Sequence, residues 1–369
     1  MRISSLHLRN FRNLTDLHIR PGHTFNLFVG ANAQGKTNII ESVGLISTSL
    51  SFRTQDFRDM IQQGQQKALV CAEVQSEIGK DELAVTMNLK QKTFLKNGKR
   101  TRNTRIYTVL FAPEEIMLIR SSPAARRKHM DTLISQLLPT YRNMVSRYEK
   151  VIRHRNRILC DFDVPSRLRS KNLKPWDDQL IALGAKVVAG RNMWCERLNC
   201  LIPEHYTAIA PKDPPAMFTY MPHCGEKALG GGIDSIEEAL ASQLDMRRED
   251  ELLRGFTVVG PHRDDFEAKI GAGGIKHFGS QGQHRSFILA LKMSEMDLFK
   301  EVSGEEPILL LDDVASELDS HRNCFFFECL RQAKGQVFIT ATAERDFNWT
   351  NSHDVFVFDV VDGTVTARK

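Results

Sequence analysis

Apolar and polar positions alternate in the first third of the chain, and this pattern predicts β-strands. Residues 3–8 alternate in this way, and the apolar run 25–29 is typical of a buried strand. Further strand-like segments are 68–74, 83–89 and 107–111. Asn97-Gly98, which precedes a basic run, has the composition of a tight hairpin turn. We therefore expect this part of the chain to be mostly sheet.

After Pro113 the apolar positions recur at helical spacing, which predicts helices from about 115 to 205. One stripe has near-heptad spacing and suits an antiparallel helical arm; its members are Leu180, Leu183, Val187, Trp194, Leu198 and Leu201. Residues 203–232 are rich in proline and glycine, so we expect an irregular connection there. The following residues, 235–238, have the spacing of a capping box and predict a short helix that Gly255 ends.

From residue 256 the pattern returns to strands. Runs at 257–259 and 266–270 are followed by a helix that begins near Gln283. Further predicted strands are 307–311, 336–340 and 355–359. We expect an α/β protein in which a helical insertion separates two sheet-rich halves, with domains 1–114, 115–254 and 255–369.

Composition narrows the class of protein. The chain has 369 residues, 41% hydrophobic and 26% charged, which indicates a folded protein of two to three domains at about 150 residues each. No apolar run approaches the roughly 20 residues that cross a bilayer, and the first residues lack the apolar stretch of a signal peptide. Seven cysteines without a Cys-x-x-Cys pair do not favour a zinc ribbon or a disulfide framework. We expect a cytoplasmic protein without a membrane segment.

Basic residues are concentrated in one part of the chain. The net charge is only +5, from 50 Lys and Arg against 45 Asp and Glu. Between Lys92 and Lys174, however, 20 basic residues stand against 6 acidic ones, so this segment carries +14 and the rest carries 5 − 14 = −9. A solvated face would explain any single cluster, but their co-location favours DNA phosphates as ligands. The candidate DNA-contacting residues are Lys99, Arg100, Arg102, Arg153, Arg155 and Arg157.

Residues 30–37 fit the Gly-x4-Gly-Lys-Thr phosphate loop and lie between an apolar strand and the start of a helix. In such a loop backbone N–H groups wrap the phosphates, the lysine reaches the β- and γ-phosphates, and the threonine hydroxyl binds Mg²⁺. The alternative is a chance glycine-rich turn, but both flanking elements favour ATP. The predicted nucleotide-binding residues are Gly30, Asn32, Gly35, Lys36 and Thr37.

The apolar run 307–311 ends in two carboxylates, Asp312 and Asp313. In a P-loop sheet, the strand beside the phosphate loop delivers an acid to the metal, so Asp312 is expected to join Thr37 at Mg²⁺. Asp313 would then face the attacking water as the catalytic general base. An ordinary strand followed by a polar turn is the simpler alternative.

A second candidate anion site, residues 279–283, directly precedes a helical pattern. One ATP does not easily need two such sites in one subunit, so the arrangement suggests two copies that complete each other's sites. Ser280, Gly282 and Gln283 are therefore predicted to contact nucleotide. The alternative is that Ser280 only caps the helix.

Residues 262–265, His-Arg-Asp-Asp, could suggest a nuclease metal site. We expect instead a network of His, Arg and Asp that holds the sheet beside residues 279–283, and we assign no nuclease activity. Cys195 and Cys200 lie near Trp194 and are expected to pack the helical arm.

Together these motifs resemble the ATPase heads of ABC and SMC proteins, in which the signature and D-loop act across a dimer. The D-loop corresponds to residues 316–319 here. The chain resembles most closely the RecF family of bacterial recombination mediators, through Leu6-x-Leu8-x-Asn10-Phe11-Arg12-Asn13, residues 30–41, Phe111-x-Pro113-Glu114, residues 260–265 and residues 309–319. The resemblance implies an α/β fold, an ABC/SMC-type P-loop ATPase head with an inserted α-helical arm domain.

The resemblance also implies a homodimer that forms on ATP and binds gapped or junction DNA. With RecR and RecO, such a protein would help load RecA onto single-stranded DNA coated by its binding protein. Asp313 stands where ABC heads usually have glutamate, which predicts weak ATPase activity. Glu114 is nearest to the missing Q-loop glutamine, and Thr340 or Thr342 would take the role of the missing switch histidine.

Other nucleotide-binding classes fit less well. A GTPase needs an Asn-Lys-x-Asp guanine reader, which the sequence lacks, and a small-molecule kinase does not need residues 279–283. An ABC-type nucleotide-binding subunit of another complex, such as a transporter, shares the ATP chemistry and is the alternative. It does not account for the +14 segment or the inserted arm.

Overall fold

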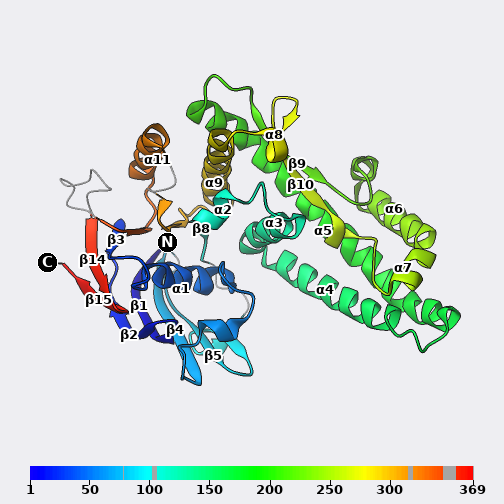
Figure 1. Ribbon diagram of the computed structural model, residues 1–369, viewed down its shortest axis with the longest axis horizontal. Coiled ribbons are helices and arrows are strands. Elements are labelled where there is room, and N and C mark those ends of the chain that lie inside the picture. The colour runs from blue at the N-terminus through cyan, green and yellow to red at the C-terminus, as the bar shows by residue number, and fades with distance from the viewer. Residues whose placement is uncertain (78, 102–105, 315–318, 344–354, 369) are drawn as a thin grey trace. The chain divides into compact units, whose positions relative to one another are not determined.

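The structure is a computed structural model, and it describes residues 1–77, 79–101, 106–314, 319–343 and 355–368. The chain forms two compact units, and Figure 1 labels many of their helices and strands. The head unit comprises Met1–Ile116 and Lys292–Lys369, and the arm unit comprises Met117–Leu291. The chain has the α/β fold that the sequence predicts, with a helical insertion between two parts of the head.

The boundaries between the units differ from the predicted ones. The first falls after Ile116 rather than after residue 114, and the second after Leu291 rather than after residue 254. The second difference arises because β10 (Asp265–Ile270) pairs along its length with β9 (Ala216–Met221) inside the arm unit. Strand pairing brings residues after 254 into the core of the arm.

A mainly parallel sheet in the order β15-β14-β3-β13-β12-β8 forms the centre of the head unit. Its strands are β3 (Phe25–Val29), β8 (Thr108–Phe111), β12 (Ile308–Leu311), β13 (Val337–Ala341), β14 (Val355–Val361) and the antiparallel β15 (Thr364–Ala367). The helices of this unit include α1 (Lys36–Thr48), α2 (Pro113–Ile116) and α11 (Ser320–Gln332). Because β3 lies between β14 and β13, the strand that enters the phosphate loop is fixed on both sides.

An antiparallel sheet in the order β2-β1-β4-β5-β6-β7 forms the second sheet of the head unit. Its elements are β1 (Arg2–Phe11), β2 (Leu14–Ile19), β4 (Lys67–Ser76), β5 (Gly79–Asn88), β6 (Lys92–Lys96) and β7 (Lys99–Arg100), with a short 3₁₀ helix, η1 (Phe57–Met60). One face of the sheet, with Leu8 and Val70, shares a core with Ile39 of α1. The predicted hairpin turn at Asn97-Gly98 is confirmed, since both residues have positive φ, 49° and 74°.

The arm unit is mainly helical, as predicted. Its helices are α3 (Pro123–Leu137), α4 (Pro139–Leu159), α5 (Ser166–Ile209), α6 (Gly232–Met246) and α7 (Arg248–Arg254). The longest, α5, continues through Pro175 and Pro203 and packs along α4. Gly255 ends α7 with φ 75°, as expected, whereas Ser235 lies inside α6 rather than at its start.

The remaining arm elements include a three-stranded antiparallel sheet, β11-β10-β9. They are η2 (Glu226–Gly231), η3 (Pro261–Arg263), β11 (Gly273–Gly274), α8 (Ile275–Phe278) and α9 (Gln281–Ser303), which continues into the head unit. Strand β9 lies in the segment 203–232, whose proline and glycine content obscured it, and residues 257–259 do not form the expected strand. Within the described ranges, no helix is long and apolar enough to cross a membrane.

Candidate nucleotide-binding site

The phosphate loop joins the end of β3 to the first residue of α1. Gly35 precedes the helix with φ 112°, a backbone conformation that favours glycine. Gly30 packs so closely on Val360 that a Cβ atom would lie 2.2 Å from Val360 O. The loop backbone itself therefore requires both glycines, whether or not a ligand is bound.

Lys36 lies folded over the phosphate loop. Its Nζ donates hydrogen bonds to the carbonyl oxygens of Gly30 at 2.5 Å and Ala31 at 2.7 Å. Burial lowers the pKa of Lys36, and the carboxylates of Asp313 and Asp312 oppose this shift. Phosphate oxygens are stronger, charged acceptors that can take the place of these carbonyls.

Thr37 and Asp312 are in direct contact, although 275 positions separate them in the sequence. Thr37 Oγ1 donates to Asp312 Oδ1 at 2.9 Å. Burial raises the pKa of Asp312, and hydrogen bonds from Thr340 and Thr37 oppose the shift. A carboxylate and a hydroxyl beside a phosphate loop are the hard oxygen ligands that Mg²⁺ takes, with phosphates and water in its other positions. These two residues therefore fit the predicted magnesium ion.

Thr340, in β13, connects the two aspartates. Its Oγ1 donates to Asp312 Oδ1 at 2.8 Å and accepts the backbone N–H of Asp313 at 2.9 Å. Asp313 has φ 49°, which is uncommon for a residue other than glycine. These contacts suit a positioning residue, while the switch role of Thr340 and the general-base role of Asp313 stay predictions. Of the D-loop, residues 316–318 lie outside the described residues.

Two turns hold Gln34 of the phosphate loop. Its side-chain Oε1 accepts the backbone N–H of Asp362 at 2.5 Å, and its carbonyl oxygen accepts that of Gly363 at 3.0 Å. The same carbonyl accepts Asn13 Nδ2 at 3.2 Å. Asp362-Gly363 is the β14–β15 turn, with φ of 46° and 74°. No sequence motif marked these contacts, since they join the loop to a turn near the end of the chain.

A cavity of about 700 Å³ lies beside α1, and its polar lining includes Arg12, Asn13, Asn38, Arg53, Gln62 and Gln63. The fully buried Glu41 orders this lining: it accepts two hydrogen bonds from Arg12, at 2.9 and 2.7 Å, and one from Ser51 at 2.5 Å. Arg53 donates to Asn38 Oδ1 at 2.7 Å. Amide and guanidinium groups so near a phosphate loop can hydrogen-bond polar parts of a nucleotide. Arg12 and Asn13 belong to the family motif at residues 6–13, but the motif alone predicts no role for either.

Ser280 and Gln283 cap the start of α9 reciprocally, within the arm unit. Ser280 Oγ accepts the backbone N–H of Gln283 at 3.1 Å, and Gln283 Oε1 accepts that of Ser280 at 3.0 Å. Ser280 is exposed, and Gly282 is half-buried. The capping alternative is therefore observed, and a nucleotide contact by Ser280, Gly282 and Gln283 stays a prediction.

Four of the six candidate DNA-contacting residues have exposed side chains. Lys99 and Arg100 lie on β7 of the head unit, and Arg153 and Arg157 lie on α4 of the arm unit. Arg102 lies outside the described residues. Their contact with DNA phosphates stays a prediction.

The structure corrects the prediction that Arg155 contacts DNA. Its side chain is fully buried and ion-paired with Asp177 and Glu251, each at 2.8 Å, and it donates to Thr257 Oγ1 at 2.7 Å. Two positions along a helix turn the side chain by about 200°, so Arg155 faces the core while Arg153 faces solvent. Arg155 therefore stabilises the arm, and its predicted contact with DNA is wrong.

Residues 260–265 belong to a buried polar network in the arm unit. Asp264 accepts a hydrogen bond from Arg191 at 2.9 Å, and Asp265 accepts two from Arg126, each at 2.8 Å. These bonds fasten β10 and its preceding turn to α3 and α5, which agrees with the expected structural role. In the described part of the chain, no group of three or more His, Cys, Asp or Glu could hold a metal ion.

A phosphate loop follows the central parallel strand β3, an acid follows β12, with β13 between the two strands, and an antiparallel sheet completes the unit. These features define a P-loop ATPase head of the ABC/SMC class. The family described as RecF/RecN/SMC N terminal domain matches residues 2–365. The chain belongs to this family and, within it, to the RecF proteins. The DNA replication and repair protein RecF of Halothermothrix orenii is 32% identical over 374 residues, covering 100% of both chains.

Two solved structures are similar to this chain over its full length. A structure of the recombination mediator protein RecF with ATP in the RecFOR pathway is 29% identical and has a TM-score of 0.88. It covers 100% of this chain, and 99% of the RecF chain is matched. A structure of an Smc head bound to the C-terminal winged-helix domain of ScpA is 15% identical and has a TM-score of 0.54. The match covers 100% of this chain and 97% of the Smc head chain. That second likeness shows the shared fold alone.

Proposed function

We propose that this chain is an ATP-dependent, DNA-binding recombination mediator. It dimerises on ATP at gapped or junction DNA and, with RecR and RecO, promotes RecA loading in the cytoplasm during replication-linked repair. The observation that carries the proposal is the contact of Thr37 with Asp312 beside the phosphate loop, in a chain that matches RecF over its full length.

At the nucleotide site, the phosphates of ATP would lie against residues 30–35 and the N-terminus of α1. Lys36 exchanges its two carbonyl acceptors for oxygens of the β- and γ-phosphates. Thr37 and Asp312 would hold Mg²⁺, which would supply positive charge that stabilises the phosphates. Asp313 takes the proton of the attacking water, and its side chain, one methylene shorter than glutamate, accounts for weak hydrolysis.

Dimerisation in this proposal uses the start of α9. Ser280, Gly282 and Gln283 contact the nucleotide held by a second copy of the chain. The reciprocal cap favours this role, because it fixes the exposed Ser280 at a helix N-terminus, where negative charge is stabilised. Stable dimers would therefore require ATP.

DNA binding is assigned to exposed cations of both units. Lys99, Arg100, Arg153 and Arg157 contact phosphates, and Arg102 is proposed with them on sequence alone. Phosphate contacts of this kind bind DNA without sequence preference and weaken as salt rises.

Sedimentation velocity tests nucleotide, dimer and DNA together. The wild-type chain is measured alone, with Mg²⁺ and ATP, with a gapped duplex, and with all three. We expect a dimer only with ATP and the largest complex with ATP and DNA. Lys36→Ala should keep the circular dichroism of the wild type but stay monomeric with ATP, because it loses a phosphate contact and no core side chain.

Two results would contradict the proposal. If folded Lys36→Ala bound ATP with wild-type affinity, the nucleotide site could not be at the phosphate loop. An ATP-dependent dimer that does not bind DNA at low salt would instead favour the alternative, an ABC-type nucleotide-binding subunit of another complex.

A further inference from the structure

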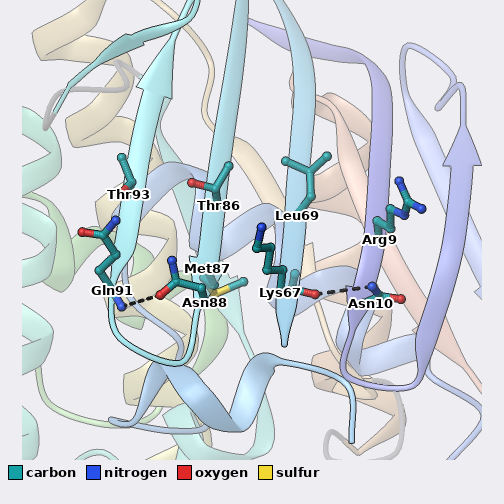
Figure 2. Close-up of a pocket in the computed structure, with 10 residues that line it drawn as sticks. Arg9, Asn10, Lys67, Leu69, Thr86, Met87, Asn88, Gln91 and Thr93 are labelled. Atoms are coloured by element: carbon teal, nitrogen blue, oxygen red, sulfur yellow. Dashed lines mark hydrogen bonds between the residues drawn. The ribbon is translucent and has the colours of Figure 1, made fainter. Parts of the chain in front are cut away.

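A groove of about 530 Å³ crosses one face of the antiparallel sheet of the head unit (Figure 2). Its side chains come from four neighbouring strands and the loop between β5 and β6, and none belongs to the phosphate loop. The lining residues that bear on ligand chemistry are Arg9, Lys67, Leu69, Thr86, Gln91 and Thr93. None of these six residues belongs to a motif that predicts a function.

The register of the sheet places four of these side chains in one row. Arg9 pairs with Leu69, Leu69 with Thr86, and Thr86 with Thr93, so all four project from the face opposite the core. Four strands spaced about 4.8 Å apart span about 14 Å. That length accommodates several phosphates of one DNA strand, which advance about 3.4 Å each along the helix axis.

The adjacent row leads to a residue already assigned to DNA. It runs from His7 through Cys71, Ala84 and Leu95 and ends at Arg100 on β7. Arg100 and the groove therefore share one face of the sheet, with Arg100 at its β7 edge and Arg9 on β1. A strand of DNA held at the β6–β7 hairpin can continue into the groove.

The charge of the groove is positive. Arg9 and Lys67 are both exposed, and among the residues that the structure describes neither forms an ion pair. On the same face, Asp16 lies across from Arg9 and its carboxylate contacts His7 at 3.1 Å. The acids Glu73 and Glu82 lie beyond the second row, at the other end of the sheet.

We propose that this groove binds the sugar–phosphate backbone of DNA and extends the contact of the β6–β7 hairpin across the sheet. Arg9 and Lys67 neutralise phosphates, Leu69 offers apolar surface to the sugars, and neutral hydrogen-bonding groups come from Thr86, Gln91 and Thr93. The described lining contains no aromatic side chain on which a base would stack, so recognition is of the backbone and independent of sequence.

An acidic protein segment is the competing occupant, and the sheet matches it less well. Each of β1, β4, β5 and β6 is paired on both sides, so the groove offers no free strand edge to an extended peptide. The continuity with Arg100 also favours DNA. This inference rests on the proposed DNA binding and adds two cations, Arg9 and Lys67, from outside the basic segment 92–174.

The test compares two matched double variants. Arg9→Ala with Lys67→Ala removes the cations of the groove, and Arg20→Ala with Lys80→Ala removes one exposed arginine and one exposed lysine elsewhere in the head unit. Binding of a fluorescent duplex of random sequence is measured with ATP over a range of salt concentrations. We expect the groove variant to bind about tenfold more weakly and its log–log salt slope to fall by about 2, because two phosphate contacts are lost.

Controls separate a local effect from a loss of fold. ATP affinity and thermal unfolding of the groove variant should match the wild type, and Arg9→Lys with Lys67→Arg should restore DNA affinity. The matched Arg20/Lys80 variant should keep both affinity and slope. An equal loss of DNA affinity in both double variants would show that only overall charge matters. It would overturn the proposal that the groove binds DNA.

The results distinguish a failure of the groove from a failure of the proposed DNA binding. If the wild type binds DNA and Arg100→Ala weakens it, but the groove variant binds with wild-type affinity and slope, the groove is not a DNA surface. That result combined with lost binding of a protein partner would assign the groove to the acidic-segment alternative. If the wild type itself does not bind the duplex, the proposed function has failed first.

Discussion

The buried side chains of Thr340 and Asp312 are joined by a 2.8 Å hydrogen bond, and the same threonine hydroxyl accepts the backbone N–H of Asp313. One oxygen atom therefore orients the carboxylate of the first aspartate and holds the backbone of the second at φ 49°. A non-glycine residue adopts that conformation only where its surroundings support it. The hydroxyl of Thr340 thus couples the proposed metal ligand to the proposed base.

Thr340→Val should test this coupling, because it keeps the shape of the side chain and removes both hydrogen bonds. Leaving the N–H of Asp313 without its acceptor should lower the free energy of unfolding by about 1–3 kcal/mol. We also expect ATP hydrolysis to fall about tenfold. Unfolding in denaturant and turnover against Mg²⁺ concentration measure the two effects. Thr340→Ser restores the hydroxyl and should restore both; a valine variant that behaves like the serine variant would exclude the role.

The contact of Gly363 with the β1–β2 turn leads to a second prediction. A Cβ atom on Gly363 would lie 2.4 Å from Asn13 O, so Gly363→Ala must displace the turn that holds Gln34. We expect ATP affinity to fall about tenfold, measured by titration with a fluorescent nucleotide. Gly304→Ala is the matched control, because its φ of 73° imposes the same backbone strain and no described atom lies within 4 Å of its Cβ position. Equal ATP affinities in the two variants would show that the turn does not position the loop.

Ser280→Arg should separate nucleotide binding from dimerisation. The bulky side chain enters the site of the facing copy, so the variant should bind ATP normally and stay monomeric in sedimentation. Loss of the helix cap adds a destabilisation of about 1 kcal/mol. His277→Arg places the same side chain at a nearby exposed position and should still dimerise. If Ser280→Arg still dimerises with ATP, Ser280 does not lie at the dimer interface.

The stability of the arm unit should depend on pH through His262. Tyr148 donates to His262 Nδ1 at 2.7 Å, and burial lowers the pKa of His262 from 6.5 to about 4. The unfolded chain therefore takes up a proton below pH 6.5 that the folded arm takes up only near pH 4. Stability present above pH 6.5 is lost as the pH falls, by about 3 kcal/mol over this window.

The matched variant for this prediction is His262→Gln, which has no titrating ring. Burial raises the pKa of the neighbouring Asp264, so that carboxyl acts in the opposite sense and remains in both proteins. The difference between wild-type and variant unfolding free energies should therefore shrink from pH 7 to pH 4. A constant difference across this range would show that His262 titrates as an exposed histidine.

The parts of the nucleotide site that sequence could predict are those fixed by local spacing. The phosphate loop needs a strand before it and a helix after it, and both were visible as patterns around residues 30–37. The partnership of Thr37 with Asp312 followed from where parallel strands end. The contacts of Gln34 with Asp362 and of Thr340 with Asp313 were not predictable, because they depend on which turns and strands become neighbours.

The errors have equally physical causes. Arg155 was grouped with Arg153 and Arg157 by charge alone, but a helix places alternate positions on opposite sides. Strand β9 lies in a segment rich in proline and glycine, and its partner β10 is far along the chain, so neither composition nor local period revealed it. Missing that pairing also moved the predicted second boundary of the arm to residue 254.

The position of β3 in its sheet has a consequence for synthesis on the ribosome. Residue 37 completes the phosphate loop early, but the strands on either side of β3 are β13 and β14, which are translated about 300 residues later. The arm is one continuous segment, 117–291, and can fold before β13 and β14 of the head have been synthesised. Until then β3 has exposed edges that other chains can pair with. A nascent chain released before residue 355 would therefore expose this strand to aggregation, whatever the condition of its arm.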